Sequence, residues 1–348
     1  MSTMSRVVVA ICFAPFPVQF SNPVLVKQLA AADIGGINND GNARQTSPKK
    51  KSTPKANTGP RYAAQVPEPT AREIPYGDHP RQILDFWRAS QPDPTPLVFV
   101  IHGGGWKGGS KERLDRFVDI NRLLKAGISV VAINYRFVTQ ADPITKTPPV
   151  HAPLHDAARA LQFVRSKAKE WNLDKNRVGA AGGSAGACSS LWLAFHDDLK
   201  ATQSGDQILA ESTRLQAAAV IGAQTTLDPK QMREWTPNSK YGSHAFGIEG
   251  GFDAFYKSRA KIINWIEEYS PYALVSQDDP PVALFYNAPP DLGKPQKDPT
   301  HTANFGVKLK EHCESTGTVC ELIHPGAKSS KYPTPTDFLI ETLTNKGK

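Results

Sequence analysis

The feature that most constrains the fold is the pentapeptide Gly-Gly-Ser-Ala-Gly at residues 182–186. It lies between a short apolar segment, residues 177–181, and an apolar helix expected to begin near Ala187. Glycines on both sides of Ser184 allow a sharp turn from strand to helix, which would leave the serine hydroxyl exposed above a sheet. The pattern fits G-x-S-x-G and predicts a nucleophilic serine, although a purely structural glycine turn would also satisfy it.

A second glycine-rich segment, His-Gly-Gly-Gly-Trp at residues 102–106, directly follows the apolar run 96–101. Consecutive glycines bring bare backbone N–H groups within reach of a substrate carbonyl oxygen. We therefore predict an oxyanion hole formed by the N–H groups of Gly104, Gly105 and Ala185. The two motifs lie about 80 residues apart within alternating strands and helices, and this order is more specific than either motif alone.

Apolar runs and helical spacing alternate over most of the chain, from Pro69 to Lys348. Besides 96–101 and 177–181, strands are predicted at residues 81–87, 128–133, 217–221, 282–286 and 319–323. Helices are predicted at residues 110–124, 154–168, from 187 onward and at about 336–343. This alternation predicts one α/β domain with a mostly parallel sheet and helices on both faces.

These motifs resemble the α/β-hydrolase superfamily over roughly residues 70–345. The similarity is to its carboxylesterase group, which includes hormone-sensitive-lipase-type and bacterial feruloyl/acetyl-xylan esterase-like proteins. Residues 76–82, 270–272 and 278–282 also resemble segments of those esterases. The resemblance implies an α/β-hydrolase fold and a serine carboxylic ester hydrolase without metal or cofactor. Its substrates would be small-molecule esters or acyl groups of polysaccharides.

The same resemblance implies a triad in the chain order serine, acid, histidine. Two acids follow the penultimate predicted strand, Asp298 and Asp291. Asp298 is favoured because its distance from the following helix is close to the spacing in those esterases. A carboxylate that only caps the helix is the alternative for either residue.

The histidine departs from the family pattern. Residues 325–329 are Pro-Gly-Ala-Lys-Ser, where those esterases usually have Pro-Gly-Ala-Gly-His, and no histidine follows His324. His301, three residues after Asp298, is the first replacement candidate and His324 the second. The predicted catalytic residues are thus Ser184, Asp298 and His301. The alternative is an α/β-hydrolase-like binding protein without a catalytic histidine.

The glycine-rich loop also fits the dinucleotide-binding fingerprint G-x-G-x-x-G, since Gly103, Gly105 and Gly108 follow a predicted strand at that spacing. The next strand ends in Asn-Tyr-Arg at residues 134–136, without an acid for a ribose hydroxyl. Arg136 could instead receive a 2′-phosphate. The downstream G-x-S-x-G turn argues against this hypothesis.

The other histidines have structural interpretations. His102 is expected to brace the glycine-rich loop. His151 and His155, four residues apart, have a spacing that can hold a metal on a helix. They lack a third ligand nearby in the sequence, so we expect surface histidines and predict no metal site.

An aromatic-rich insertion lies between Asp228 and Ser270. Two interpretations remain open for it: a lid or substrate wall over Ser184, or ordinary packing of helices at the sheet edge. As a wall, with Trp106 and Trp235, it would suit a flat acyl group or a sugar ring.

The net charge of +8 is concentrated in the first 60 residues, which hold seven basic and two acidic side chains. This favours a solvated basic tail over a nucleic-acid partner. Residues 1–32 resemble a bacterial signal peptide, with an apolar segment after Arg6 and an Ala-Ala-Ala cleavage pattern, so export is predicted. Residues 33–68 are predicted to be a disordered basic linker. No apolar run reaches 18 residues, so no integral membrane association is expected.

The four cysteines are too few for a disulfide scaffold and include no Cys-x-x-Cys pair for zinc. Cys313 and Cys320 flank a short turn, so a local disulfide is open in an oxidising compartment.

Overall fold

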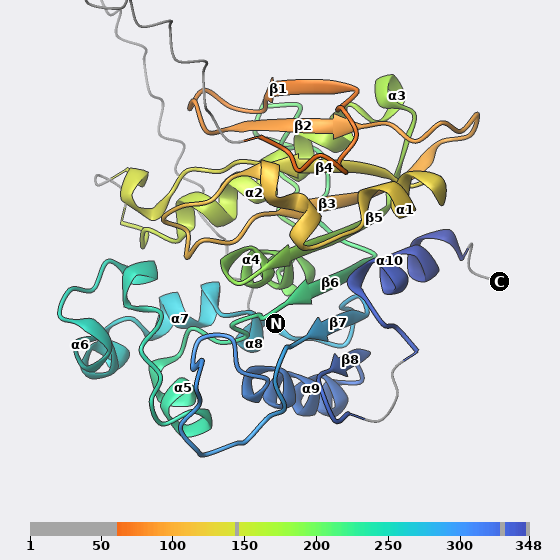
Figure 1. Ribbon diagram of the computed structural model, residues 1–348. Helices are drawn as coiled ribbons and strands as arrows, with labels where there is room; N and C mark the ends of the chain where they lie inside the picture. Colours follow the sequence, from red (N-terminus) through yellow and green to blue (C-terminus); the bar gives the residue numbers. More distant parts are fainter. Residues whose placement is uncertain (1–60, 143–145, 328–330, 346–348) are drawn as a thin grey trace, which may run out of the picture. The chain divides into compact units, whose positions relative to one another are not determined.

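Short apolar runs form the central strands of an eight-stranded sheet in the computed structural model (Figure 1). The structure describes residues 61–142, 146–327 and 331–345. The strands are β1 Ala71–Pro75, β2 Ile83–Trp87, β3 Thr95–Ile101, β4 Ser129–Ile133, β5 Leu173–Gly183, β6 Ala217–Ile221, β7 Val282–Phe285 and β8 Cys320–Ile323. Their order is β1-β2-β4-β3-β5-β6-β7-β8, and β2 pairs antiparallel with β1 and β4 while the other pairs are parallel. The mostly parallel sheet is as predicted.

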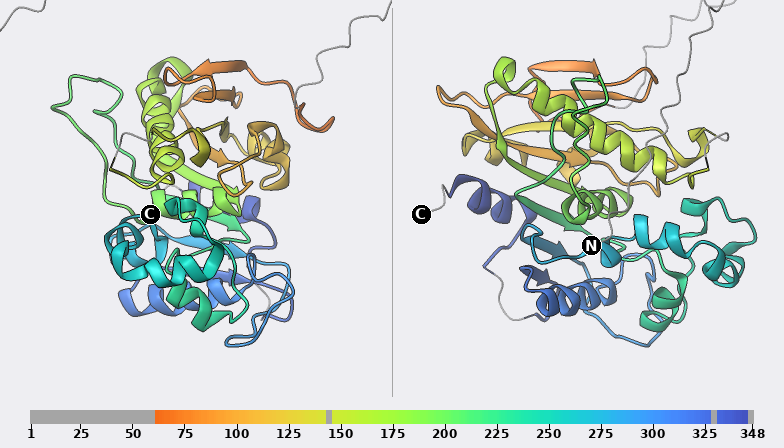
Figure 2. Two further views of the ribbon diagram at one scale, coloured as in Figure 1. Left: turned by 90° about the vertical axis from the view of Figure 1, so that its left-hand side faces the viewer. Right: turned by 180° about the vertical axis from the view of Figure 1, so that it is seen from behind.

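Helices cover both faces of the sheet (Figures 1 and 2). On one face, η1 Lys111–Arg116, α1 Ile120–Lys125 and α10 Pro335–Thr344 pack with the sheet into one apolar cluster. On the other, α2 His151–Ser166, α4 Ala185–Phe195 and α9 Asn304–Thr316 contribute to a second, larger cluster. The remaining helices are α3 Ala168–Trp171, α5 Pro229–Trp235, α6 Gly251–Ser258, α7 Ile263–Tyr269 and α8 Pro271–Leu274, with short 3₁₀ turns at Val138–Gln140, Ser243–Phe246 and Arg259–Lys261. The central strands are buried between the two layers, which explains their continuous apolar runs.

The predicted helix over residues 110–124 is wrong in one respect, because it is divided into η1 and α1. The side chain of Asp119 accepts a hydrogen bond from the N–H of Arg122 at 3.1 Å and so caps a new helix. The break leaves Phe117 outside both helices. It lies between two segments that the sequence pattern had joined.

Strand β1 was not predicted from the sequence, because it is an exposed edge strand that contains charged residues and ends in proline. Packing also begins before Pro69. The hydroxyl of Tyr62 donates to Asp85 Oδ2 at 2.7 Å, and Val66 is buried. Residues 61–68 therefore belong to the folded unit. The predicted signal peptide and residues 33–60 of the predicted linker lie outside the described residues.

The carboxyl ends of β3, β5, β6 and β7 meet along one edge of the sheet. The glycine-rich loop follows Ile101, Ser184 follows β5, Gly222 follows β6 and Asn287 lies just beyond β7. Loops at this edge form the usual binding crevice of a parallel α/β sheet. The topology thus brings together segments more than 100 residues apart.

The cysteines Cys188, Cys313 and Cys320 are free and buried. Both Cys313 and Cys320 are free thiols, so the disulfide left open by the sequence is not formed. In the described part of the chain, no helix has the length and apolar character needed to cross a bilayer.

Candidate active site

Ser184 lies on a strained turn between β5 and α4. Its backbone angles are φ 54° and ψ −121°, which a non-glycine residue rarely adopts, and its N–H donates to the carbonyl of Ile221 at 3.0 Å. A Cβ at Gly182 would lie 2.6 Å from the carbonyl oxygens of both Ile101 and Gly186. Glycine is therefore required beside the serine, and the turn takes the form that G-x-S-x-G predicts.

Asp298, His301 and Ser184 form one hydrogen-bonded chain. His301 Nδ1 lies 2.8 Å from Asp298 Oδ2, and His301 Nε2 lies 2.9 Å from Ser184 Oγ. Because the carboxylate accepts, Nδ1 carries the proton and Nε2 is free to accept from the serine hydroxyl. The imidazole is thus oriented to take a proton from Ser184.

The Asp298 carboxylate is held in its charged form. Its Oδ1 also accepts from the backbone N–H groups of Thr300 at 3.1 Å and His301 at 3.2 Å. Partial burial raises the pKa of Asp298, but the hydrogen bonds and the nearby His301 outweigh burial, and the pKa is lowered overall. A charged carboxylate therefore faces the imidazole.

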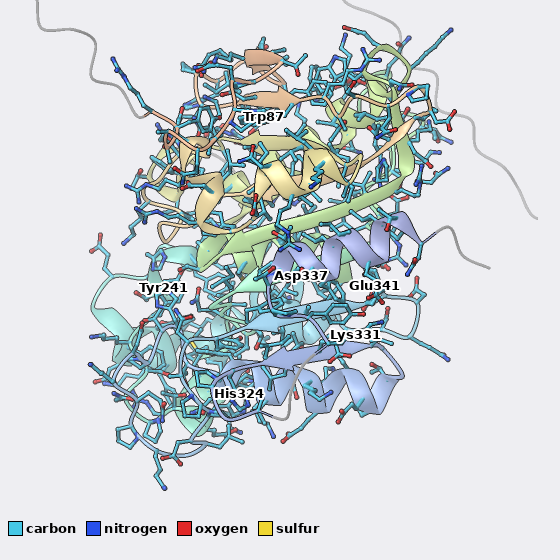
Figure 3. All side chains as sticks on the ribbon, turned by 45° about the vertical axis from the view of Figure 1, so that its right-hand side comes forward. Trp87, Tyr241, His324, Lys331, Asp337 and Glu341 are labelled. Carbon is cyan, nitrogen blue, oxygen red and sulfur yellow. The ribbon has the colours of Figure 1, made fainter. Side chains whose placement is uncertain are left out.

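The alternative acid and base have other contacts. The Asp291 carboxylate lies 3.2 Å from the ammonium of Lys294. His324, near the end of β8 (Figure 3), donates from Nδ1 to the carbonyl of the following proline at 2.9 Å. Within the described residues, no hydrogen bond joins either side chain to Ser184. Of the residues that the sequence left open, the structure places the Asp298–His301 pair against the serine.

The glycine-rich loop packs directly against the serine turn. A Cβ at Gly103 would lie 2.6 Å from the carbonyl oxygen of Gly183 and 3.4 Å from Ser184 Cβ. Gly103 and Gly104 line a pocket of about 300 Å³ together with the triad side chains. Gly105 follows directly with φ 61° but is not among the residues that line this pocket.

Ala185 is the third residue predicted to donate an N–H group to the oxyanion. It is buried and is the first residue of α4, where backbone N–H groups have no intrahelical acceptor. The positive end of the helix dipole lies at the same place, and it favours negative charge beside Ser184.

His102 braces the glycine-rich loop, as predicted. Its Nδ1–H donates to the carbonyl of Gly103 at 2.7 Å, and its Nε2 accepts from Arg81 at 3.3 Å. The ring stacks on Tyr135 with a centroid separation of 4.2 Å. Burial lowers the pKa of His102 to about 3, so the ring stays neutral and keeps this tautomer.

The aromatic side chain in the pocket is Phe117, and the expectation that Trp106 forms a wall is wrong. Trp106 is fully buried, and its Nε1–H donates to Ser189 Oγ at 3.0 Å. A Cβ at Gly183 would lie 2.9 Å from Cδ1 of Phe117, so this glycine lets the ring pack beside the serine. In the sequence, Phe117 is one of the apolar residues of the helix predicted at 110–124, and nothing there indicates that it borders the pocket.

The aromatic-rich insertion packs beneath the loop that carries Asp298 and His301. None of its residues is among those that line the pocket. Asn304, at the start of α9, donates from Nδ2 to the carbonyls of Trp235 at 2.8 Å and Asp291 at 3.1 Å, and to Thr236 Oγ1 at 3.0 Å. Its Oδ1 accepts from the N–H of Asp291 at 2.8 Å. Of the two interpretations left open, the contacts favour structural packing over a lid.

Gln224 is a site residue that no motif in the sequence marks. It is fully buried, and its Nε2 donates to the carbonyls of Gly222 at 3.1 Å and Thr300 at 2.7 Å. Gly222 directly follows β6, and Thr300 directly precedes His301. One side chain thus connects the sheet edge to the loop of the histidine.

His151 and His155 are not the free surface residues that we expected. Their rings lie 3.8 Å apart, and His151 Nδ1 hydrogen-bonds to the hydroxyl of Tyr269 at 3.0 Å. Burial lowers the pKa of both, for His155 to about 3. No group of metal-binding side chains is found in residues 61–142, 146–327 and 331–345.

The dinucleotide hypothesis required the side chain of Arg136 to bind a 2′-phosphate. Arg136 is bound to Asp156, with Nη2 at 2.6 Å from Oδ1 and Nε at 3.0 Å from Oδ2. This ion pair and the hydrogen bond from the N–H of Arg136 to the same carboxylate hold the guanidinium against α2. It is therefore already neutralised.

Comparison with known proteins finds a family match and several relatives that are named as esterases. A family model described as BD-FAE matches residues 84–291. Esterase LipC of Mycobacterium tuberculosis is 30% identical over 119 residues, 33% of this chain and 27% of that protein. An acetyl esterase of Salmonella schwarzengrund is 30% identical over 142 residues, 38% of this chain and 40% of that protein. The chain thus spans less than half the length of these relatives.

The fold is also found among solved structures. A truncated form of a carbohydrate esterase from gut microbiota superposes with a TM-score of 0.60 at 20% identity, covering 82% of this chain and 99% of that one. At this identity the similarity concerns the fold, which is the α/β-hydrolase fold predicted from the sequence.

Proposed function

The chain belongs to the BD-FAE family, and from that premise we propose that it is a serine hydrolase of carboxylic esters. Ser184 is the nucleophile, His301 the general base and Asp298 the carboxylate that orients it. The observation that carries the proposal is the hydrogen-bonded chain from Asp298 through His301 to Ser184 Oγ, with distances of 2.8 and 2.9 Å. Chemistry of this type is recognised by geometry and not by the position of its residues in the sequence.

The reaction proceeds in two halves. Ser184 Oγ attacks the ester carbonyl carbon while His301 Nε2 takes its proton, and the resulting oxyanion accepts hydrogen bonds from the N–H groups of Gly104 and Ala185. Collapse breaks the bond to the alcohol, which leaves with the proton from His301. Water then attacks the acyl-enzyme, giving its proton to His301, and the acid and free Ser184 are released.

The pocket and the relatives favour small acyl groups on carbohydrate. A volume of about 300 Å³ beside Ser184, with Phe117 in its wall, suits a short or flat acyl group. Relatives named as an acetyl esterase and a carbohydrate esterase support acyl groups of polysaccharides as the substrate class. Export, indicated by residues 1–32, is part of the same proposal because polysaccharide is met outside the cell.

The non-catalytic alternative rested on the missing histidine after the last strand. His301 approaches Ser184 from the loop after β7, so that reason no longer applies.

The test is turnover of p-nitrophenyl acetate by the full chain and by Ser184→Ala, His301→Ala and His324→Ala. His324→Ala is the matched control, since it removes a histidine that has no hydrogen bond to the serine. We expect Ser184→Ala and His301→Ala each to lose at least about 10³-fold in kcat, and the control to retain wild-type activity. Equal rates in wild type and Ser184→Ala would refute the serine hydrolase, and a fully active His301→Ala would refute its base. Release of acetate from acetylated xylan then tests the substrate class.

A further inference from the structure

We propose that Arg113 and Arg116 bind a carboxylate of the substrate, so that the enzyme prefers esters carrying a carboxylate near the scissile bond. The inference rests on the proposed ester hydrolysis and specifies its substrate class. It starts from two positive side chains in the pocket that the mechanism does not use.

Both arginines line the same pocket as the triad. The pocket beside Ser184 and His301 includes Arg113, Arg116 and Phe117 in its wall. The two arginines are exposed and come from η1, whereas His301 comes from the loop after β7. A substrate attached at Ser184 would therefore lie within the pocket that they line.

Neither guanidinium has an anionic partner. In the part of the chain that the structure describes, no ion pair or hydrogen bond is found for the side chain of Arg113 or Arg116. Eight other arginines form ion pairs with carboxylates there: Arg72, Arg122, Arg136, Arg159, Arg177, Arg214, Arg233 and Arg259. The two pocket arginines thus retain their full capacity to bind an anion.

The carboxylates nearest to them already have partners. Asp298 accepts from His301, Asp115 accepts from Gln65 Nε2 at 3.0 Å, and Glu112 accepts from Lys111 Nζ at 3.0 Å. Asp115 and Glu112 line a neighbouring pocket that the two arginines also border, but they do not line the pocket beside Ser184. A substrate carboxylate in the pocket beside Ser184 would therefore meet two guanidinium groups that form no ion pair in the described part of the chain.

The backbone that carries the two arginines is firmly held. The ammonium of Lys111 is buried against Glu73 and Asp85, 3.2 Å from the Asp85 carboxylate, and the N–H of Lys111 donates to Asn134 Oδ1 at 2.8 Å. Leu114 is buried in the core. Anchors on both sides of Arg113 reduce the ordering cost of binding, and guanidinium groups match the planar geometry of a carboxylate.

Two kinds of ester would satisfy this chemistry. The carboxylate can belong to the alcohol, as in an acylated acidic sugar, or to the acyl group, as in a monoester of a dicarboxylic acid. We test the first with 4-acetoxybenzoate against the neutral 4-acetoxybenzamide. We test the second with mono-4-nitrophenyl adipate against its methyl ester.

The experiment compares kcat/KM for each pair in the full-length wild type, Arg113→Gln, Arg116→Gln, the double variant and Arg88→Gln. Arg88 is an exposed arginine outside the pocket and serves as the matched control. In at least one pair, we expect the kcat/KM of the charged ester divided by that of the neutral ester to fall about tenfold for each arginine removed. In Arg88→Gln this ratio should stay at the wild-type value. Added salt should lower the wild-type ratio. An unchanged ratio in the double variant, for both pairs, would overturn the proposal.

A binding measurement separates this proposal from the proposed function. Calorimetric titration of Ser184→Ala, with and without both arginine substitutions, measures the affinity for 4-acetoxybenzoate and 4-acetoxybenzamide without turnover. Tighter binding of the charged ester that depends on the two arginines supports the inference even if no ester is hydrolysed. Serine-dependent turnover combined with equal affinity for the two esters refutes the carboxylate site and leaves the hydrolase intact.

Discussion

Asn304 is predicted to be the anchor that holds the loop of the acid and the histidine in place. Its side chain is fully buried and makes four hydrogen bonds, two to the backbone of Asp291 and two to Trp235 and Thr236 in the insertion. Asn304→Ala removes all four while keeping a residue that favours the start of α9. The insertion would then lose its main polar connection to the loop.

The expected cost follows from the number and burial of these bonds. Each intramolecular hydrogen bond contributes about 1 kcal/mol net. Because the two N–H groups of Nδ2 are shared among three acceptors, the four contacts amount to about 3 kcal/mol, and buried partners left unsatisfied add to that. A domain is stable by only about 5–15 kcal/mol, so the variant should remain folded but lose a large part of its stability. The loop also sets the 2.9 Å contact between His301 and Ser184, so kcat should fall as well.

Urea unfolding followed by tryptophan fluorescence measures the stability change, and p-nitrophenyl acetate turnover measures kcat. Asn238→Ala is the matched control, because Asn238 makes two comparable hydrogen bonds to the backbone of Gln296, but at an exposed position. We expect that control to lose less than about 1 kcal/mol. A loss below about 1 kcal/mol for Asn304→Ala, with kcat unchanged, would refute the anchoring role.

Three further predictions concern other parts of the domain. Histidine in an unfolded chain has a pKa near 6.5, whereas burial lowers the pKa of His155 to about 3. Protons therefore bind the unfolded state more tightly below pH 6.5, and stability falls as the pH is lowered. Between pH 7 and pH 5, urea titrations should show that wild type loses about 2 kcal/mol more unfolding free energy than His155→Phe. Lys111→Ala leaves the buried Asp85 carboxylate without its ammonium and should cost about 3–5 kcal/mol of unfolding free energy; a loss below 1 kcal/mol would contradict this. Gly103→Ala should lower kcat/KM about 100-fold, because its Cβ would displace the loop from Ser184, whereas Gly108→Ala, with open space around its Cβ, should match wild type.

The amino-acid sequence was sufficient for most features that depend on neighbours along the chain, although it missed the cap at Asp119 that divides η1 from α1. Continuous apolar runs mark strands buried on both faces, and all but the exposed edge strand β1 were predicted. The glycines around Ser184 specify a turn that few other residues permit, and consecutive glycines after β3 specify a loop that can approach it. These are local properties of backbone and burial, and they were enough to predict the fold and the position of the serine.

The tertiary structure was needed wherever a role depends on which distant side chains meet. Sequence spacing left Asp298 and Asp291 open as acids, and His301 and His324 as bases, because spacing measures length along a loop and not its path. Only the packed loop after β7, held by Asn304 and Gln224, decides which of them reaches Ser184. Likewise, the sequence shows which side chains are apolar but not which of them border a cavity. The position of Phe117 in the pocket and the structural role of the insertion were therefore decided by three-dimensional contacts alone.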